Sequence, residues 1–235
     1  MTNYQEFVHQ IAKLNINLEF KPPQKKLPLK KIESIIQKPL PQELFDFYSF
    51  CDGFEGVWQS QNQSLIVADE HIPSLEEMFG DYKKPKKISK SMYLKDEIYK
   101  LYDNPFWEQI WDDNFLNIEK CDPDTPEGLT FFNFLMNLKP LMFLNGDSKN
   151  LVIDFFDSQK DYQIYYQDYT DLYPLHLDFQ TFYKILFQIG TTAHWFIAFF
   201  DEHNKPTWDT TVEYTYIQEH FPDFDIDILK NKKRL

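Results

Sequence analysis

The chain has 235 residues, of which 43% are hydrophobic and 18% aromatic, and this apolar content excludes an intrinsically disordered protein. A chain of this length buries roughly 70% of its unfolded surface, so its stability requires no disulfide or metal. The net charge is −13, and 23 of the 24 basic residues are lysines, which nearly excludes bidentate arginine recognition of phosphate. The same abundance of Lys, Phe, Ile and Asn is also what an AT-rich genome produces.

The charge is unevenly distributed along the chain. Residues 1–100 carry 14 acidic and 14 basic side chains, whereas residues 101–230 carry 23 acidic and 7 basic ones, a net charge of −16. The last five residues add +3. An acidic half repels nucleic acid and favours a basic protein as partner, although a role in solubility alone accounts for the same pattern.

The N-terminus and the apolar runs bear on where the protein is targeted. Residues 1–10 are amphipathic and lack the apolar core of a signal peptide. The longest apolar run, residues 195–200, is far shorter than the roughly 20 residues that a membrane-spanning helix requires. We therefore expect a cytoplasmic protein without membrane contacts.

The first half predicts mainly helices. In chain order, the pattern predicts a helix over 3–14, an exposed Pro/Lys connector over 21–28, a short helix over 32–36, a helix over 41–51, two short strands at 57–58 and 65–67, and a short helix over 73–79. The helix over 41–51 is the best marked, because Pro41 suits the first helical position and Gly53 suits the C-terminal cap. Its predicted buried side chains include Leu44, Phe47 and Tyr48.

The second half changes to a pattern typical of strands. Residues 96–138 are aromatic and irregular, with a helix over 98–111 and an acidic turn over 122–128. Strands at about 140–145, 150–156 and 162–167 are separated by polar turns and predict an antiparallel meander, with a fourth strand over 173–177. A helix over 179–189 that buries Phe182 and Leu186, and an apolar helix over 191–203, follow. The predicted fold class is α+β, an antiparallel sheet packed against helices.

The sequence contains no convincing catalytic or metal-binding set. Its six histidines are scattered, and its six glycines form no phosphate-binding loop. Cys51 ends an apolar helical pattern and is interpreted as a small buried hydrophobe, and nothing local supports a thiol dyad of Cys51 with His71. We therefore predict a non-enzymatic protein with no cofactor and no metal.

Two charged segments have functional alternatives. Asp122, Asp124 and Glu127 superficially resemble a calcium loop, but the later bidentate glutamate is missing, so an acidic turn is the better interpretation. The basic stretches over 21–31 and 83–90 could contact nucleic acid. Only Tyr82 could offer a stacking platform there, so solvated loops are favoured and no nucleic-acid partner is expected.

Three segments, taken in order, resemble the SUKH superfamily, which includes the Smi/Knr-type fungal regulators of glucan synthesis. The first runs from Leu40-Pro41-x-x-Leu44 to Phe50-Cys51-Asp52-Gly53. The second runs from Pro140-Leu141-Met142-Phe143 to Leu151-Val152-Ile153-Asp154. The third runs from Gln163-Ile164-Tyr165-Tyr166 to Phe179-x-x-Phe182. The chain departs from the family pattern in four ways: Asp52 stands where Asn is usual, a glycine pair is reduced to Gly146, the first two motifs are unusually far apart, and residues 191–235 extend beyond the common core.

The resemblance implies an organisation and a function. It divides the chain into an N-terminal helix and connector over 1–29, a SUKH-like core over 30–190 with an enlarged insert near 80–138, and a helical C-terminal extension over 191–235 that packs on the core. Many bacterial members are immunity proteins that bind and neutralise a cognate toxin, possibly a nuclease, in the cytoplasm. The fungal members imply the alternative, a regulatory adaptor in cell-wall and glucan-synthesis signalling.

An inhibitor of a nuclease toxin needs carboxylates that complement a basic cleft. We expect the partner-binding residues among acidic side chains in predicted turns of the second half: Asp112, Asp113, Asp122, Asp124, Asp157 and Asp161. Asp154 is excluded, because it ends a predicted strand and resembles the family's strand-terminal Asp, for which a structural hydrogen bond is expected.

Overall fold

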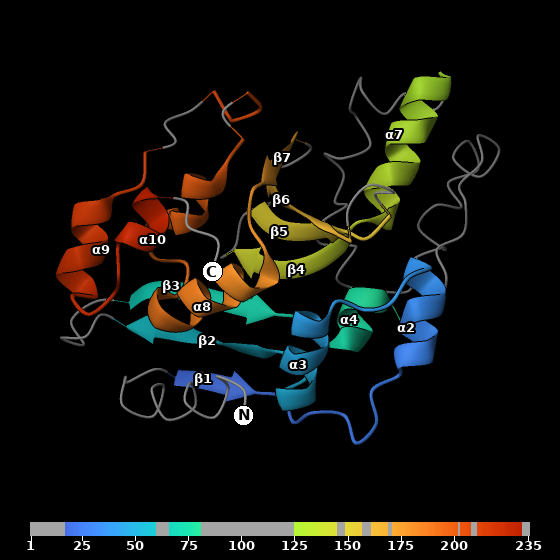
Figure 1. The fold of residues 1–235 in the computed structure, drawn as a ribbon, viewed down its shortest axis with the longest axis horizontal. Helices are drawn as coiled ribbons and strands as arrows, with labels where there is room; N and C mark the ends of the chain where they lie inside the picture. The colour runs from blue at the N-terminus through green and yellow to red at the C-terminus, as the bar shows by residue number, and fades with distance from the viewer. Residues whose placement is uncertain are drawn as a thin grey trace.

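The structure, a computed structural model, describes residues 17–59, 66–80, 125–144, 149–156, 161–168, 171–201, 203–207 and 211–231 (Figure 1). Its strands are β1 (Asn17–Phe20), β2 (Phe54–Gln59), β3 (Ile66–Ile72), β4 (Lys139–Leu144), β5 (Lys149–Asp154), β6 (Gln163–Asp168) and β7 (Asp171–Leu175). Its helices are α2 (Leu29–Ile36), α3 (Gln42–Phe50), α4 (Leu75–Phe79), α7 (Pro126–Asn137), α8 (Phe179–Ile189), the 3-10 helix η3 (Thr192–Phe199), α9 (Tyr214–His220) and α10 (Asp227–Lys230).

The seven strands form one sheet in which spatial order equals chain order and every neighbouring pair is antiparallel. The α+β class predicted from the sequence is therefore confirmed. The β3–β4 pairing is much shorter than the others, since it consists only of Glu70 opposite Leu144 and His71 opposite Phe143. The sheet is thus built from a first part, β1–β3, and a second part, β4–β7, that meet along a short contact.

The predicted meander of the second half corresponds to β4, β5 and β6, with bounds that agree within two residues, and β7 is the fourth strand. The register explains the alternation in the sequence. Leu151 lies opposite Tyr166 and Ile153 opposite Ile164, and all four side chains belong to the hydrophobic core. One face of this part of the sheet therefore supplies the apolar surface on which the helices pack.

Helices α3 and α8 contact each other. In Figure 1, α8 crosses in front of β2 and β3, and α3 lies at the end of β2. The side chains predicted to be buried on these two helices are all 0% exposed: Leu44, Phe47, Tyr48, Phe182 and Leu186. The ring of Phe47 stacks on that of Tyr183 at a centroid distance of 4.5 Å and an interplanar angle of 8°. The packing predicted for these helices is confirmed, and the aromatic stack links them directly.

The structure corrects three predictions of secondary structure. β1 was not predicted. α7 begins at Pro126, inside the expected acidic turn over 122–128, because the Thr125 hydroxyl accepts a hydrogen bond from the Gly128 N–H at 3.0 Å and caps the helix. The expected helix over 191–203 is a 3-10 helix with positive φ at Ala193 and His194. The helices predicted over 3–14 and 98–111 lie outside the described residues.

The C-terminal elements contribute to the same hydrophobic core as the sheet. η3 is almost wholly apolar, and the Trp195 indole donates to the Gly190 carbonyl at 2.6 Å. The later buried side chains of this region are Val212, Ile217, Phe221, Phe224, Ile226, Ile228 and Leu229. Residues 223–228 alternate strictly, with apolar side chains buried and aspartates exposed. This segment thus presents a charged outer surface on an apolar base.

Among the described residues, no helix combines the length and the apolar character that crossing a membrane requires.

Candidate functional site

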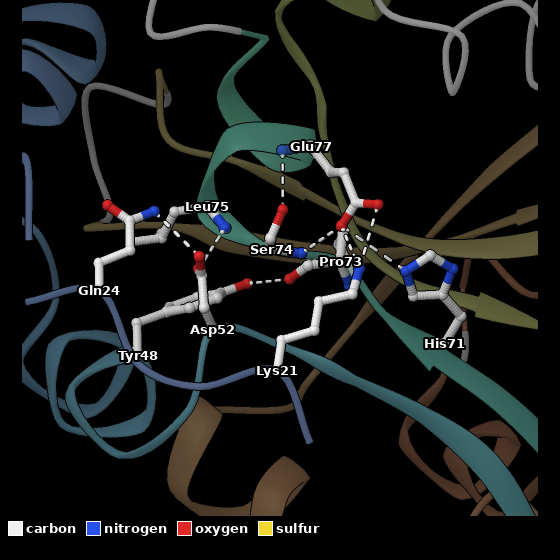
Figure 2. Close-up of polar contacts among 9 residues, drawn as sticks. All are labelled: Lys21, Gln24, Tyr48, Asp52, His71, Pro73, Ser74, Leu75 and Glu77. Atoms are coloured by element: carbon white, nitrogen blue, oxygen red, sulfur yellow. Dashed lines mark hydrogen bonds and ion pairs between the residues drawn. The ribbon is translucent and has the colours of Figure 1, made fainter. Parts of the chain in front are cut away.

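Six polar residues from four separate segments meet beside the N-terminus of α4 (Figure 2). We call this cluster the polar junction, and it consists of Lys21, Gln24, Asp52, His71, Ser74 and Glu77. The contributing segments are the connector after β1, the end of α3, the end of β3 and the start of α4. The junction therefore joins residues that lie up to 56 positions apart in the chain.

Glu77 is at the centre of the junction. The Glu77 N–H donates to the Ser74 hydroxyl at 3.2 Å, and the Glu77 carboxylate accepts from the Ser74 N–H at 2.6 Å, which completes a capping box. The same carboxylate accepts from the Lys21 ammonium at 2.9 and 3.2 Å. Both side chains of this ion pair are 35% exposed. One carboxylate therefore both caps α4 and holds the connector.

His71 lies on the other side of the Glu77 carboxylate. Its Nε2 is 3.7 Å from Oε2 of Glu77, which is too long for a hydrogen bond, and its ring packs on Phe143 at 5.1 Å between centroids. The His71 imidazole, the Ser74 N–H and the Lys21 ammonium hold the pKa of Glu77 well below its usual range and outweigh partial burial, which raises it. Glu77 is therefore a stable anion, and a poor general base at neutral pH.

The Asp52 carboxylate joins the connector after β1 to the first turn of α4. One carboxylate oxygen accepts from the Leu75 N–H at 2.9 Å, and the other accepts from the Gln24 amide at 2.9 Å. The two oxygens of the Asp52 carboxylate thus hold the connector and the first turn of α4 through separate hydrogen bonds, whereas an Asn side chain would offer a single oxygen to both donors.

Backbone contacts fix the same junction. The Lys21 N–H donates to the Gly53 carbonyl and the Asp52 N–H donates to the Lys21 carbonyl, both at 3.0 Å. The buried hydroxyl of Tyr48 donates to the Pro73 carbonyl at 2.9 Å. Gly53 has a φ of +86°, which favours glycine, and a Cβ placed there would lie only 2.4 Å from the Ile72 carbonyl oxygen. The junction is therefore tightly packed at backbone level.

The polar junction holds neighbouring segments together. Its central carboxylate, that of Glu77, already interacts with the Lys21 ammonium, the Ser74 N–H and the His71 imidazole. Burial raises the pKa of the nearby Cys51 thiol to about 12, so no thiolate is present at neutral pH. No group of three or more His, Cys, Asp or Glu side chains among the described residues could hold a metal ion.

The Glu77→Gln substitution should lower the free energy of unfolding by about 1–2 kcal/mol at pH 7, since it removes an ion pair that is partly screened and weakens a capping box. The folded pKa lies below the unfolded value of 4.5, so the contribution is fully present above pH 4.5 and declines as the pH falls below it. Urea unfolding between pH 7 and pH 2.5 measures it. Glu76→Gln, on the exposed face of the same turn, is the matched control. A difference between the two variants that stays constant with pH would contradict the linkage.

The structure describes one of the six predicted partner-binding aspartates. Asp161 is exposed, and its backbone carbonyl accepts from the Lys38 ammonium at 3.2 Å. The remaining five lie outside the described residues: Asp112, Asp113, Asp122, Asp124 and Asp157. Asp154 is 5% exposed, and its carboxylate accepts from the Phe156 N–H at 2.7 Å, which confirms the expected structural hydrogen bond.

The structure also shows an acidic surface that the sequence-based selection of sites missed. We call it the acidic end, and it consists of the exposed side chains of Glu213, Glu219, Asp223, Asp225 and Asp227. None of these carboxylates forms an ion pair with another described residue. The nearby Lys230 ammonium instead lies over the Tyr214 ring, 5.7 Å from its centroid. The alternation of aspartate with apolar residues over 223–228 was the signal that could have identified it.

Comparison with known proteins adds no relative, since the chain matches no family model, no curated protein and no solved structure. The resemblance to the SUKH superfamily consequently rests on the three sequence motifs alone.

Proposed function

We propose that this chain is a non-enzymatic protein-binding domain that neutralises a basic toxin domain as its cognate immunity protein. The observation that carries the proposal is the acidic end, five exposed carboxylates that form no ion pair with another described residue. The SUKH-like motifs support the same conclusion, because immunity is a function of many bacterial members of that superfamily.

The character of the exposed surface supports a polar contact. Where the structure places side chains, no Ala, Val, Ile, Leu, Met, Phe, Tyr or Trp is among the most exposed residues. Docking on the described surface would therefore depend on charge and hydrogen bonds more than on apolar anchors. A nuclease toxin fits this requirement, since its phosphate-binding cleft is basic and can be blocked by carboxylates.

The alternative function, a regulatory adaptor in cell-wall signalling, uses the same scaffold with a different partner. The two proposals differ in what binding does to the partner. An immunity protein abolishes the partner's activity at a 1:1 ratio, whereas an adaptor leaves that activity intact or redirects it. The Glu77 carboxylate is held as an anion by its neighbours, and the Cys51 thiol stays protonated. Both observations support a binding role, for an immunity protein or for an adaptor, rather than catalysis.

The test is co-purification of the chain from its source cells, identification of the bound polypeptide, and an assay of that polypeptide with increasing amounts of the chain. The expected partner is a basic toxin domain whose activity falls to background at equimolar chain. A partner whose activity survives saturation with the chain would contradict immunity and favour the adaptor.

Neutralising part of the acidic end should slow association with this partner. The triple variant Asp223→Asn, Asp225→Asn and Asp227→Asn should associate at least about tenfold more slowly at low salt and show a flatter salt dependence, because steering weakens when charge is removed. The matched control, Glu19→Gln, Glu55→Gln and Glu76→Gln, changes the net charge equally among exposed residues of the first half. Stopped-flow association across ionic strength distinguishes them.

A second variant tests the six aspartates predicted from the sequence, changed together to asparagine: Asp112, Asp113, Asp122, Asp124, Asp157 and Asp161. Single changes should be mostly mild, at about 0–1 kcal/mol each for exposed pairs. The sixfold change should slow association strongly. If the association rates of the triple and the sixfold variant both depend on salt as that of the wild type does, the interface lies away from these carboxylates.

A further inference from the structure

The opposite charge is concentrated in a second surface, which we call the lysine end. It consists of Lys25, Lys26 and Lys30, which are exposed and form no ion pair with any described residue. Other lysines nearby are already engaged: Lys21 with the Glu77 carboxylate, and Lys38 with the Asp161 carbonyl. The lysine end is therefore a surface of uncompensated positive charge on a protein whose net charge is −13.

The position of Lys30 opposes the stability of α2. Lys30 lies in the first turn of α2, where the partial positive charge of the helix N-terminus disfavours a cation. That turn contains no acidic residue, and Pro28 before it provides no side-chain cap. A lysine that destabilises its own helix and gains no local partner indicates a role other than stabilising the fold.

The two charged ends are far apart in the molecule. Figure 1, drawn with the longest axis horizontal, shows α2 near one side of the view and α9 with α10 at the other. The lysine end lies in and just before α2. The acidic end lies over the N-cap residue of α9, over α9 and α10, and over the residues between them. Since the separation follows the long axis, one copy cannot bring its own two ends together.

We propose that the lysine end of one copy docks on the acidic end of a second copy, which gives a salt-dependent head-to-tail contact. The occupant is a second copy because the chain itself presents the complementary charge, unpaired, on its opposite end. The contact is heterologous, so it propagates into rings or open chains and does not close as a two-fold dimer. It goes beyond the proposed function, although a basic toxin on the acidic end would compete with it.

The salt dependence distinguishes this contact from simple charge attraction. At about 0.01 M salt the Debye length is about 30 Å, so the net charge of −13 on each copy repels the whole of the other. At about 1 M it is about 3 Å, and the local attraction is also screened. At about 0.1 M it is about 10 Å, so only the facing ends interact. Association should therefore be strongest at intermediate salt.

Sedimentation velocity of the purified chain tests the proposal without any partner, so its outcome is independent of the toxin proposal. We expect weak self-association, with a Kd of about 1 mM or below near 0.1 M salt and weaker binding at both salt extremes. Lys26→Glu with Lys30→Glu should weaken it at least about tenfold. Lys184→Glu with Lys205→Glu, exposed lysines elsewhere, changes the net charge equally and should have a smaller effect.

The decisive experiment exchanges the charges of the two ends between two variants. One variant carries Lys25→Glu, Lys26→Glu and Lys30→Glu, and the other carries Asp223→Lys, Asp225→Lys and Asp227→Lys. Each alone should be monomeric, whereas their mixture should associate, even though both remain net negative. Circular dichroism confirms that both fold. A wild type that stays monomeric across the salt series, or a mixture of folded variants that fails to associate, would overturn the proposal.

Discussion

The Gly53→Ala substitution is expected to lower the free energy of unfolding by about 3–5 kcal/mol, a loss of the size that only a named steric conflict produces. The added Cβ would lie 2.4 Å from the Ile72 carbonyl oxygen and 2.8 Å from the carbonyl carbon and oxygen of Pro73. All three are backbone atoms, so no side-chain rotation relieves the contact. The φ of +86° adds the conformational cost of a left-handed alanine.

The measurement is urea unfolding followed by circular dichroism, with Gly80→Ala as the control. Gly80 has a φ of +53°, so alanine there carries the conformational cost of about 1 kcal/mol. The Gly53 variant should exceed it by about 2 kcal/mol or more, because the Ile72–Pro73 backbone that links β3 to α4 must move away from residue 53. Equal losses at the two glycines would show that the close approach is not rigid.

The Phe47→Ala substitution is expected to cost about 3–5 kcal/mol, the range found when a fully buried aromatic ring is deleted from a core. The Phe47 side chain is 0% exposed, and its ring contacts those of Tyr48, Phe54, Tyr183 and Phe187. Deleting it removes the contact between α3 and α8 at its centre. The surrounding rings belong to different elements, so they cannot collapse into the space together.

The control for Phe47 is a double-mutant cycle with Tyr183. Phe47→Leu and Tyr183→Leu keep apolar volume but remove the stacked pair at 4.5 Å. We expect a coupling free energy of about 0.5–1.5 kcal/mol between the two positions, measured by denaturant unfolding of both single variants and the double variant. Additive losses would mean that the two rings contribute through burial alone.

The parts of the fold that the sequence predicted are those with a local signal. The meander of β4, β5 and β6 follows from alternating apolar residues and polar turns, and α3 from its apolar face. The predicted ends of α3 were wrong in detail, since Pro41 is the N-cap and the C-cap is Cys51 in an extended conformation and not Gly53. β1 was missed because its four residues are too short to show a period, and what defines it is pairing with β2, more than 30 residues away in the chain.

The candidate site was predicted less well, for a physical reason. The ion pair between Lys21 and Glu77 joins residues 56 positions apart, and no local pattern foretells which lysine meets which glutamate. The excess of acidic residues in the second half was visible in the sequence. Its concentration in the acidic end was indicated by the alternation of aspartate with apolar residues over 223–228, and the structure shows that these apolar residues are buried.

The short contact between β3 and β4 has a consequence for how the chain reaches its native state. Within β1–β3 and within β4–β7, sheet neighbours follow one another along the chain, and the β4–β7 hairpins form by closing short loops. Joining the two parts instead requires closure over residues 73–138, and the two register pairs and the packing of α3 on α8 must offset its entropy. We therefore expect each part to form first and the two parts to dock late in folding.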